Sequence, residues 1–166
     1  MLYDRTRLKW NGWGWRDKHY DFEGGEAAFW GFLQQELGVS SVPDTPAIEL
    51  AELQLPAGRL SAEHLQELRQ LLGERVVTSD FERVFHARGR SYSDLLALRQ
   101  GEVGEVPDAV VYPVSAAEIE ALLRFARSQR LALIPFGGGS SVVGGVNAAR
   151  KADQSGILTL DLTRMN

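Results

Sequence analysis

The sequence predicts an α+β fold, in which a mainly helical N-terminal region precedes the first part of a mixed strand-and-helix domain. Residues 47–104 repeat their leucines at spacings of three and four, as amphipathic helices do. Residues 105–166 instead combine short β-branched runs, one strongly patterned helix and a glycine-rich loop. We therefore predict an aromatic-rich, mainly helical region over residues 1–104 and a separate α+β or α/β unit over residues 105–166.

Three helices are predicted in the N-terminal region. Residues 26–37 carry a broad apolar stripe at roughly helical spacing. Ser61 is the expected N-cap of a second helix, which Gly73 would end. A third helix is expected over residues 92–99, where three leucines supply the apolar content.

The second region begins with a strand that Pro113 closes. Ser115 then caps a helix, and Glu118 follows at the spacing of a capping box. The apolar runs that we expect to be strands are residues 109–112, 131–136 and 156–162.

Composition argues against several classes of function. The formal net charge is −4, and basic residues concentrate only in the first twenty positions, so a nucleic-acid partner is not expected. The chain has no cysteine and its three histidines are scattered, so we predict no metal site. No run of apolar residues is long enough for a transmembrane helix or a signal peptide. We expect a soluble, cytoplasmic protein.

The glycine-rich loop after residue 136 carries the chemistry. Gly137, Gly138 and Gly139 let the backbone turn with positive φ and approach a ligand without Cβ atoms in the way. Consecutive amides in such a turn form a nest for anionic oxygens, and Ser140 and Ser141 can add hydroxyl donors. A pyrophosphate is the natural guest.

Other interpretations of this loop are weaker. A Walker loop needs a lysine directly after the glycines, but the next lysine is Lys151. A dinucleotide fingerprint needs a third glycine where Val142 stands, followed by a helix. A flexible Gly-Ser linker remains an alternative, although the tract is short and lies between apolar runs.

Two stretches of the second region resemble a known superfamily. Residues 107–113 (Pro-Asp-Ala-Val-Val-Tyr-Pro) and 134–142 (Ile-Pro-Phe-Gly-Gly-Gly-Ser-Ser-Val) are similar to the start of the FAD-binding domain of the vanillyl-alcohol oxidase/p-cresol methylhydroxylase (PCMH) superfamily. Three further stretches resemble one branch, the alkyldihydroxyacetonephosphate synthase family of ether-lipid synthesis. They are residues 9–14 (Lys-Trp-Asn-Gly-Trp-Gly), 83–89 (Arg-Val-Phe-His-Ala-Arg-Gly) and 160–166 (Leu-Asp-Leu-Thr-Arg-Met-Asn).

The resemblance implies a PCMH-type FAD-binding domain, incomplete here, with FAD as cofactor. In that family the first loop holds the FAD pyrophosphate through its backbone amides. The cofactor-binding residues that carry over are Pro113, Pro135, Phe136, Gly137, Gly138, Gly139, Ser140, Ser141 and Val142. The family's second flavin segment, cap domain and catalytic histidine- and tyrosine-containing region have no counterpart in these 166 residues, so no catalytic residue can be named.

Three functions stay open at this point. The branch resemblance implies exchange of the acyl chain of an acyl-dihydroxyacetone phosphate for a fatty alcohol. The superfamily alone implies FAD-linked oxidation of a 2-hydroxy acid such as glycolate or D-lactate. A truncated, non-catalytic binding module is the third, and unpaired sheet edges would favour a homodimer.

Some residues have competing interpretations. Trp10, Trp13 and Trp15 lie among arginines and lysines, which would suit peripheral contact with a membrane, but packing within the protein is the simpler interpretation. His86 lies near Arg88 and Arg90 and could have an acid–base role, but with no carboxylate partner identifiable in the sequence we expect a surface or packing histidine. Asp161 and Arg164 could form a local ion pair on the last strand, but we expect them simply to face solvent.

Overall fold

The computed structural model describes residues 4–18, 22–42 and 46–165. Its helices are α1 (Glu26–Leu37), α2 (Ala62–Leu72), α3 (Asp80–Phe85), α4 (Tyr92–Arg99) and α5 (Ala116–Ser128). Its strands are β1 (Val76–Val77), β2 (Ala109–Val111), β3 (Leu131–Phe136) and β4 (Gly156–Asp161). Short 3-10 turns are η1 (Arg5–Arg7), η2 (Leu50–Glu52), η3 (Gly73–Arg75) and η4 (Leu162–Arg164). The mixed α and β content confirms the predicted fold class.

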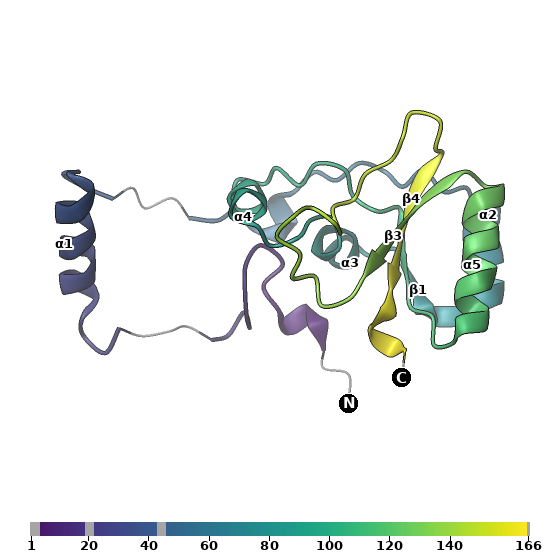
Figure 1. Cartoon of the computed structure of the whole chain (residues 1–166), viewed down its shortest axis with the longest axis horizontal. Helices are drawn as coiled ribbons and strands as arrows, with labels where there is room; N and C mark the ends of the chain where they lie inside the picture. The colour runs from purple at the N-terminus through teal and green to yellow at the C-terminus, as the bar shows by residue number, and fades with distance from the viewer. Residues whose placement is uncertain (1–3, 19–21, 43–45, 166) are drawn as a thin grey trace.

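The four strands form one sheet in the order β1-β2-β4-β3 (Figure 1). Strands β2, β4 and β3 are parallel, and the short β1 pairs with β2 in the antiparallel direction. The register sets Ala109 beside Leu158 and Leu131 beside Gly156. Strand β4, which follows β2 and β3 in the sequence, therefore lies between them in the sheet.

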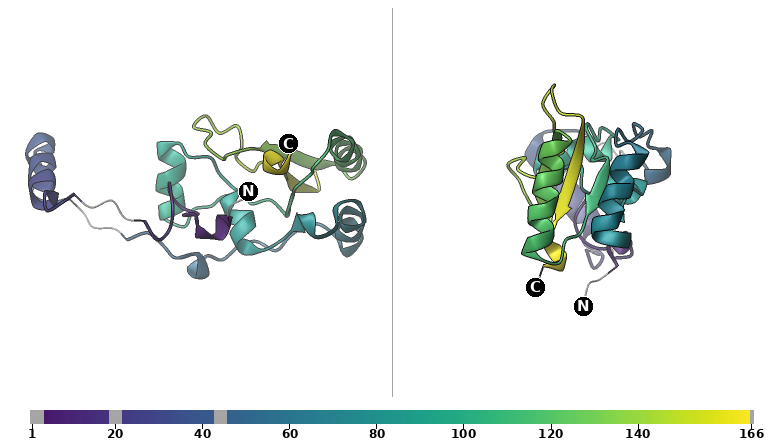
Figure 2. Two further views of the ribbon diagram at one scale, coloured as in Figure 1. Left: turned by 90° about the horizontal axis from the view of Figure 1, so that it is seen from below. Right: turned by 90° about the vertical axis from the view of Figure 1, so that its right-hand side faces the viewer.

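Helices α2 and α5 cover one face of the sheet, and α3 lies on the other (Figures 1 and 2). Because side chains alternate along a strand, each strand serves both faces. The core beneath α2 and α5 includes Leu68, Leu72, Ala109, Val111, Leu122, Phe125, Leu131, Leu158 and Leu160. Residues from both sides of the predicted boundary at residue 104 thus share one core, and the boundary itself stays a prediction.

A second core lies around the N-terminal segment. Trp10 is buried there with Val84, Leu98 and Val103, so the first indole of the Lys-Trp-Asn-Gly-Trp-Gly motif packs inside the protein. Trp13 is 56% exposed, and Trp15 is half-buried with the Arg7 guanidinium 5.5 Å from its ring centroid. Only part of the tryptophan cluster is therefore available to an external partner.

Most predicted elements are confirmed, and two of the predicted helices begin at the predicted serine cap. Ser61 accepts a hydrogen bond from the His64 amide, and Ser115 accepts one from the Glu118 amide. Glu118 does not complete a capping box. Its carboxylate binds Arg75 through two bonds of 2.7 Å and the Val114 amide at 2.8 Å. The sequence prediction missed α3 and the two-residue β1.

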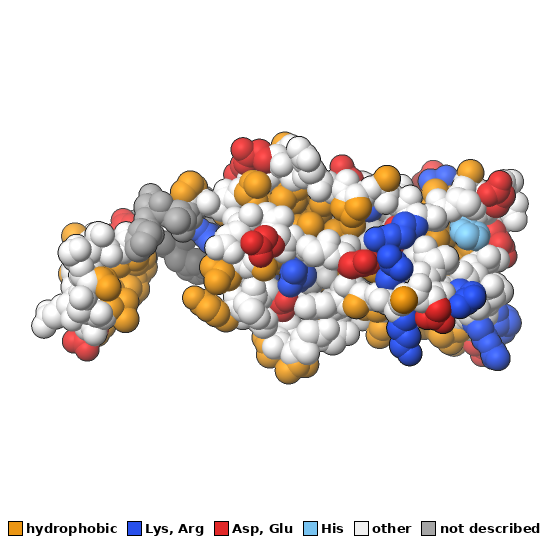
Figure 3. All heavy atoms as spheres, turned by 90° about the horizontal axis from the view of Figure 1, so that it is seen from above, with side chains coloured by type: hydrophobic (Ala, Val, Ile, Leu, Met, Phe, Trp, Pro, Cys, Tyr) orange, Lys and Arg blue, Asp and Glu red, His pale blue; other side chains and the backbone are white. Residues whose placement is uncertain are grey.

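Helix α1 occupies residues 26–37 as predicted but contains no buried residue. It lies at one end of the molecule, apart from the sheet (Figure 1), and Figure 3 shows hydrophobic side chains on its surface. Phe32 is 59% exposed and Leu37 is 65% exposed. No described helix combines the length and apolar content that a bilayer crossing requires.

Candidate functional site

The glycine-rich loop leaves the sheet at the edge where the parallel strands end. Strand β3 ends at Phe136, its neighbour β4 ends at Asp161, and Pro113 follows β2 at the same edge. Ligands of open parallel sheets bind at the carboxyl ends of the strands, because connecting loops diverge there. The topology thus brings together the predicted residues from two separate stretches of sequence.

Gly139 is required by the shape of the loop. Its φ is +72°, and a Cβ atom at this position would lie 2.6 Å from Phe136 Cζ. The Phe136 ring is buried beneath the loop, and its centroid is 4.3 Å from that of His86. Gly137 and Gly138 are exposed, with nothing within 4 Å of an added Cβ. The loop therefore packs on the Phe136 ring, its aromatic base, on one side, and exposes Gly137 and Gly138 to solvent on the other.

The segment that follows α3 holds the returning half of the loop. The Arg90 amide donates to the Ser141 carbonyl at 2.7 Å, and the Ala148 amide donates to the Ala87 carbonyl at 2.7 Å. Gly89 lies so close to the Ser141 carbonyl that a Cβ atom there would overlap it. Two backbone bonds and one glycine contact thus tie the loop to residues 87–90.

Asn147 ties the same segment to helix α4. Its Oδ1 accepts from the Gly89 amide at 2.7 Å, and its Nδ2 donates to Asp94 Oδ1 at 2.9 Å. Asp94 also accepts from Ser91, the N-cap of α4, and forms an ion pair with Arg88. These interactions keep the pKa of Asp94 below its usual value, even though burial acts in the opposite direction.

A buried polar network lies under the loop. His86 is fully buried, its Nε2 is 2.9 Å from Asp161 Oδ2, and its Nδ1 donates to the Glu82 carbonyl at 2.7 Å. The Arg5 guanidinium forms an ion pair with Asp161 and donates to Thr163 Oγ1 at 2.7 Å. Turns at the two ends of the described chain therefore meet at one carboxylate.

This network corrects two expectations. His86 does have a carboxylate partner, and Asp161 is fully buried instead of facing solvent. Arg164 stacks over the Tyr112 ring at 4.6 Å and takes no part in an ion pair with Asp161. Burial alone would raise the pKa of Asp161, but the hydrogen bonds from His86, Arg5 and Thr163 prevail and lower it to about 2.

The sequence and structure of this chain are similar to those of known FAD-binding proteins. Residues 107–166 match the family model described as FAD binding domain. The chain is 28% identical to alkyldihydroxyacetonephosphate synthase of Dictyostelium discoideum, over 96% of this chain and 30% of that one. It is 31% identical to the Mycobacterium tuberculosis protein Rv2250A, over 64% of this chain and 69% of that one. A solved alkyldihydroxyacetonephosphate synthase matches 100% of this chain and 34% of its own, with a TM-score of 0.81 and 28% identity.

The chain belongs to the alkyldihydroxyacetonephosphate synthase-like FAD-binding proteins. Its cofactor is FAD, as the resemblance implied. The chain spans about a third of the length of the synthases that it matches.

The loop has the donors that an FAD pyrophosphate needs. Among the described residues, none accepts a hydrogen bond from the backbone amides of residues 137–144. Gly137 and Gly138 offer these amides on an exposed surface with no Cβ atom to obstruct a ligand. Unsatisfied amides in a glycine-rich turn favour anionic oxygens, so the donor set fits the diphosphate group of this family's cofactor.

The other predicted site residues differ in what they can offer. Ser140 is exposed, and its hydroxyl has no partner within the described part of the chain. The Ser141 hydroxyl accepts from the Gly145 amide at 3.1 Å but keeps its own proton to donate. Pro135 and Val142 are exposed beside the loop, whereas Pro113 is buried and Phe136 can contribute only backbone atoms.

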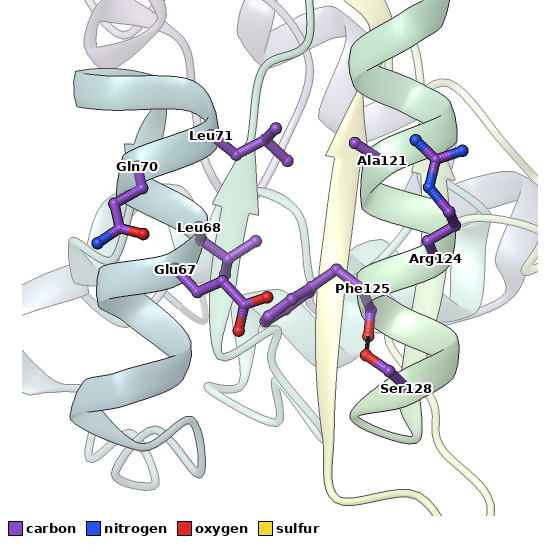
Figure 4. A pocket seen from close by; sticks show the side chains of 8 residues that line it. All are labelled: Glu67, Leu68, Gln70, Leu71, Ala121, Arg124, Phe125 and Ser128. Atoms are coloured by element: carbon purple, nitrogen blue, oxygen red, sulfur yellow. Dashed lines mark hydrogen bonds between the residues drawn. The ribbon is translucent and has the colours of Figure 1, made fainter.

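A separate pocket of about 540 Å³ lies between α2 and α5 (Figure 4). It is lined by Glu67, Leu68, Gln70, Leu71, Ala121, Arg124, Phe125 and Ser128. None of the predicted cofactor-binding residues borders it. The exposed Arg124 and Glu67 at its rim make it a solvent-facing groove between two helices, away from the glycine loop.

Proposed function

We propose that residues 135–142, together with Pro113, hold the pyrophosphate of FAD through the amides of the glycine loop. The observation that carries this proposal is the run of unbonded amides at residues 137–144, at the carboxyl edge of a parallel sheet. Ser140 adds a hydroxyl donor from the exposed side of the loop. The Phe136 ring, the Gly89 contact and the Arg90 amide keep this donor set in position without FAD.

The reaction that we propose for the protein is exchange of the acyl chain of an acyl-dihydroxyacetone phosphate for a fatty alcohol. The branch-specific motifs at residues 9–14 and 83–89 support it, as does the extent of similarity to the synthases. In such a reaction the flavin supplies covalent catalysis with no net redox change. The residues of this chain contribute binding and orientation: the loop amides fix the diphosphate, and Phe136 and His86 support them from below.

FAD-linked oxidation of a 2-hydroxy acid is the alternative, because the glycine loop alone is common to the whole superfamily. A non-catalytic binding module is a third outcome. We also propose that the protein is cytoplasmic and contacts a membrane surface peripherally. The exposed Trp13, Arg16 and Lys18 support the membrane contact. Self-association is a further proposal, because β3 is an edge strand in the described sheet.

The binding site is tested by titrating FAD into the 15N-labelled chain and following the backbone amides by NMR. We expect the amides of Gly137, Gly138 and Gly139 to shift most, whereas those of Gly73 and Gly101, away from the loop, stay in place. If FAD shifts amide resonances elsewhere but not those of the glycine loop, the proposed site is refuted, whatever the affinity.

The reaction is tested by deleting the gene in its host and measuring lipids and growth. Loss of alkyl ether lipids, restored by the intact gene, supports the exchange reaction. Intact ether lipids with a defect in using glycolate or D-lactate support the oxidase instead. No change in either would favour the non-catalytic module.

A further inference from the structure

Arg90 is a buried cation that forms no ion pair within the described part of the chain. The residue is only 6% exposed, and its Nη1 donates to the carbonyls of Arg88 at 3.1 Å and Gly89 at 2.9 Å. Both acceptors are neutral. Within the described residues no carboxylate forms an ion pair with Arg90. Asp94 forms its ion pair with Arg88 and acts on Arg90 only at longer range. Buried arginines are rare unless a negative charge accompanies them.

The backbone of Arg90 contacts the glycine loop, and its guanidinium packs on the aromatic cluster under the loop. The Arg90 amide donates to the Ser141 carbonyl at 2.7 Å. Its guanidinium carbon is 5.3 Å from the centroid of the Phe85 ring, which in turn lies 6.2 Å from the Phe136 ring under Gly139. The charged group is thus held on the Phe85 ring, which is the neighbour of the Phe136 ring that supports the loop.

Burial without a partner is unfavourable for this charge. Desolvation lowers the pKa of the Arg90 guanidinium, and the distant effect of Asp94 only partly opposes it. An anion placed at the loop would relieve that unfavourable burial, because charge-assisted bonds between arginine and phosphate are among the strongest hydrogen bonds in proteins. The two carbonyl bonds use only one of the nitrogens of the guanidinium, so donors remain for an anion.

We infer that Arg90 is a further FAD-binding residue, whose charge balances the negative charge of the pyrophosphate at the glycine loop. The inference rests on the proposed position of the pyrophosphate at residues 137–142. The loop amides give the site its shape, and Arg90 supplies the only full positive charge that we assign to it. In this arrangement Arg90 has no direct anionic partner until the cofactor binds.

The test compares three variants of the full chain by NMR titration with FAD and, separately, with inorganic pyrophosphate. Arg90→Gln keeps an amide donor for the neighbouring carbonyls but removes the charge, and we expect affinity for both ligands to fall at least about tenfold. Arg90→Lys keeps the charge and should retain most of the affinity. Arg7→Gln is the matched control, because it removes a charge from an exposed pair with Asp17.

Stability without ligand gives a second measurement. Because the unpaired charge destabilises the free protein, Arg90→Gln should be at least as resistant to urea as the wild type. Wild-type affinity in Arg90→Gln would overturn the inference, and so would a destabilised Arg90→Gln whose weaker binding Arg90→Lys fails to restore. Failure of the wild type to show loop shifts with either ligand would instead refute the proposed pyrophosphate site itself.

Discussion

Asp161 is an ionised carboxylate that solvent does not reach, and three side chains keep it charged. His86, Arg5 and Thr163 direct their donors at its two oxygens. A buried charge persists only when such partners offset the loss of water. The charge state of this one residue therefore links the N-terminal turn, α3 and the end of β4.

Substitution of Asp161 should change how stability depends on pH. Its pKa is about 2, below the usual 3.8, so its contribution is complete above about pH 4 and is lost as the pH falls towards 2. Asp161→Asn mimics the protonated form, and we expect it to lower the free energy of unfolding at pH 7 by about 2 kcal/mol. Urea unfolding of both proteins from pH 7 to pH 3 measures the difference, which should shrink at the acid end. A difference that stays constant with pH would contradict this assignment.

Gly139 allows a second prediction at the scale of single residues. In Gly139→Ala the new Cβ meets the Phe136 ring and the residue must hold a positive φ, so stability should fall by about 1–3 kcal/mol. Gly138→Ala is the matched control, because its Cβ enters open space. Urea unfolding of both variants compares them, and equal losses would show that the positive φ at residue 139 is not a constraint.

The glycine loop was predictable from sequence at this scale, but its supports were not. Three glycines followed by two serines predict a turn that can bind an anion. The pair of His86 and Asp161 is 75 residues apart in sequence, and no local pattern joins them. Arg5 is more distant still, 156 residues from its partner.

Helices α1 and α5 show how differently two apolar stripes can be used. Both were predicted from their apolar residues, and both have the expected type of structure. Helix α5 buries Leu122, Phe125 and Ala126 against the sheet, whereas α1 buries nothing in the described chain. An apolar stripe therefore predicts a helix but not what the helix packs against.

The two helices should respond differently to truncation of an apolar side chain. Leu122→Ala removes a fully buried side chain from α5, so we expect a loss of about 2–5 kcal/mol. Phe32→Ala in α1 removes a side chain that is already mostly in water, so the change should stay within about 0.5 kcal/mol. Thermal and urea unfolding would measure both, and a large loss in Phe32→Ala would mean that α1 is packed against a partner in solution.

Element ends were predictable where a capping residue marks them. Ser61 and Ser115 begin helices as their side chains indicate, and glycines follow α1 and α2. The two-residue β1 escaped prediction because two valines carry no periodicity, and its place depends on pairing with residues 110–111. Helix α3 is only six residues long, too short for a recognisable stripe.

At the scale of the whole molecule, the proposed flavin site is one open edge of the sheet. The predicted contacts come only from Pro113 and residues 135–142, and much of that loop is exposed. Sites for ligands of this size usually enclose most of the ligand surface. The family resemblance predicted the fold and the cofactor, whereas the strand order depends on long-range pairing that the sequence pattern does not specify.

We therefore expect the 166-residue chain to bind FAD with a dissociation constant in the micromolar range or weaker. This corresponds to a standard binding free energy of roughly −8 kcal/mol or less favourable. Quenching of flavin fluorescence during titration measures it, and adding pyrophosphate should compete. Sedimentation in the same samples reports self-association. Stoichiometric nanomolar binding by a monomer would show that this edge is sufficient without further enclosure.

The position of β4 has a consequence for synthesis on the ribosome. Residues 109–111 and 131–136 leave the ribosome first, but they cannot pair with each other, because the place between them belongs to residues 156–161. The ion pair between Arg5 and Asp161 also cannot form until Asp161 has been synthesised. Until β4 emerges, β3 and one edge of β2 have no partner strand and Arg5 lacks its carboxylate, so we expect the nascent chain to be exposed to chaperones and proteases. We therefore expect the sheet to close only after residues 156–161 have emerged.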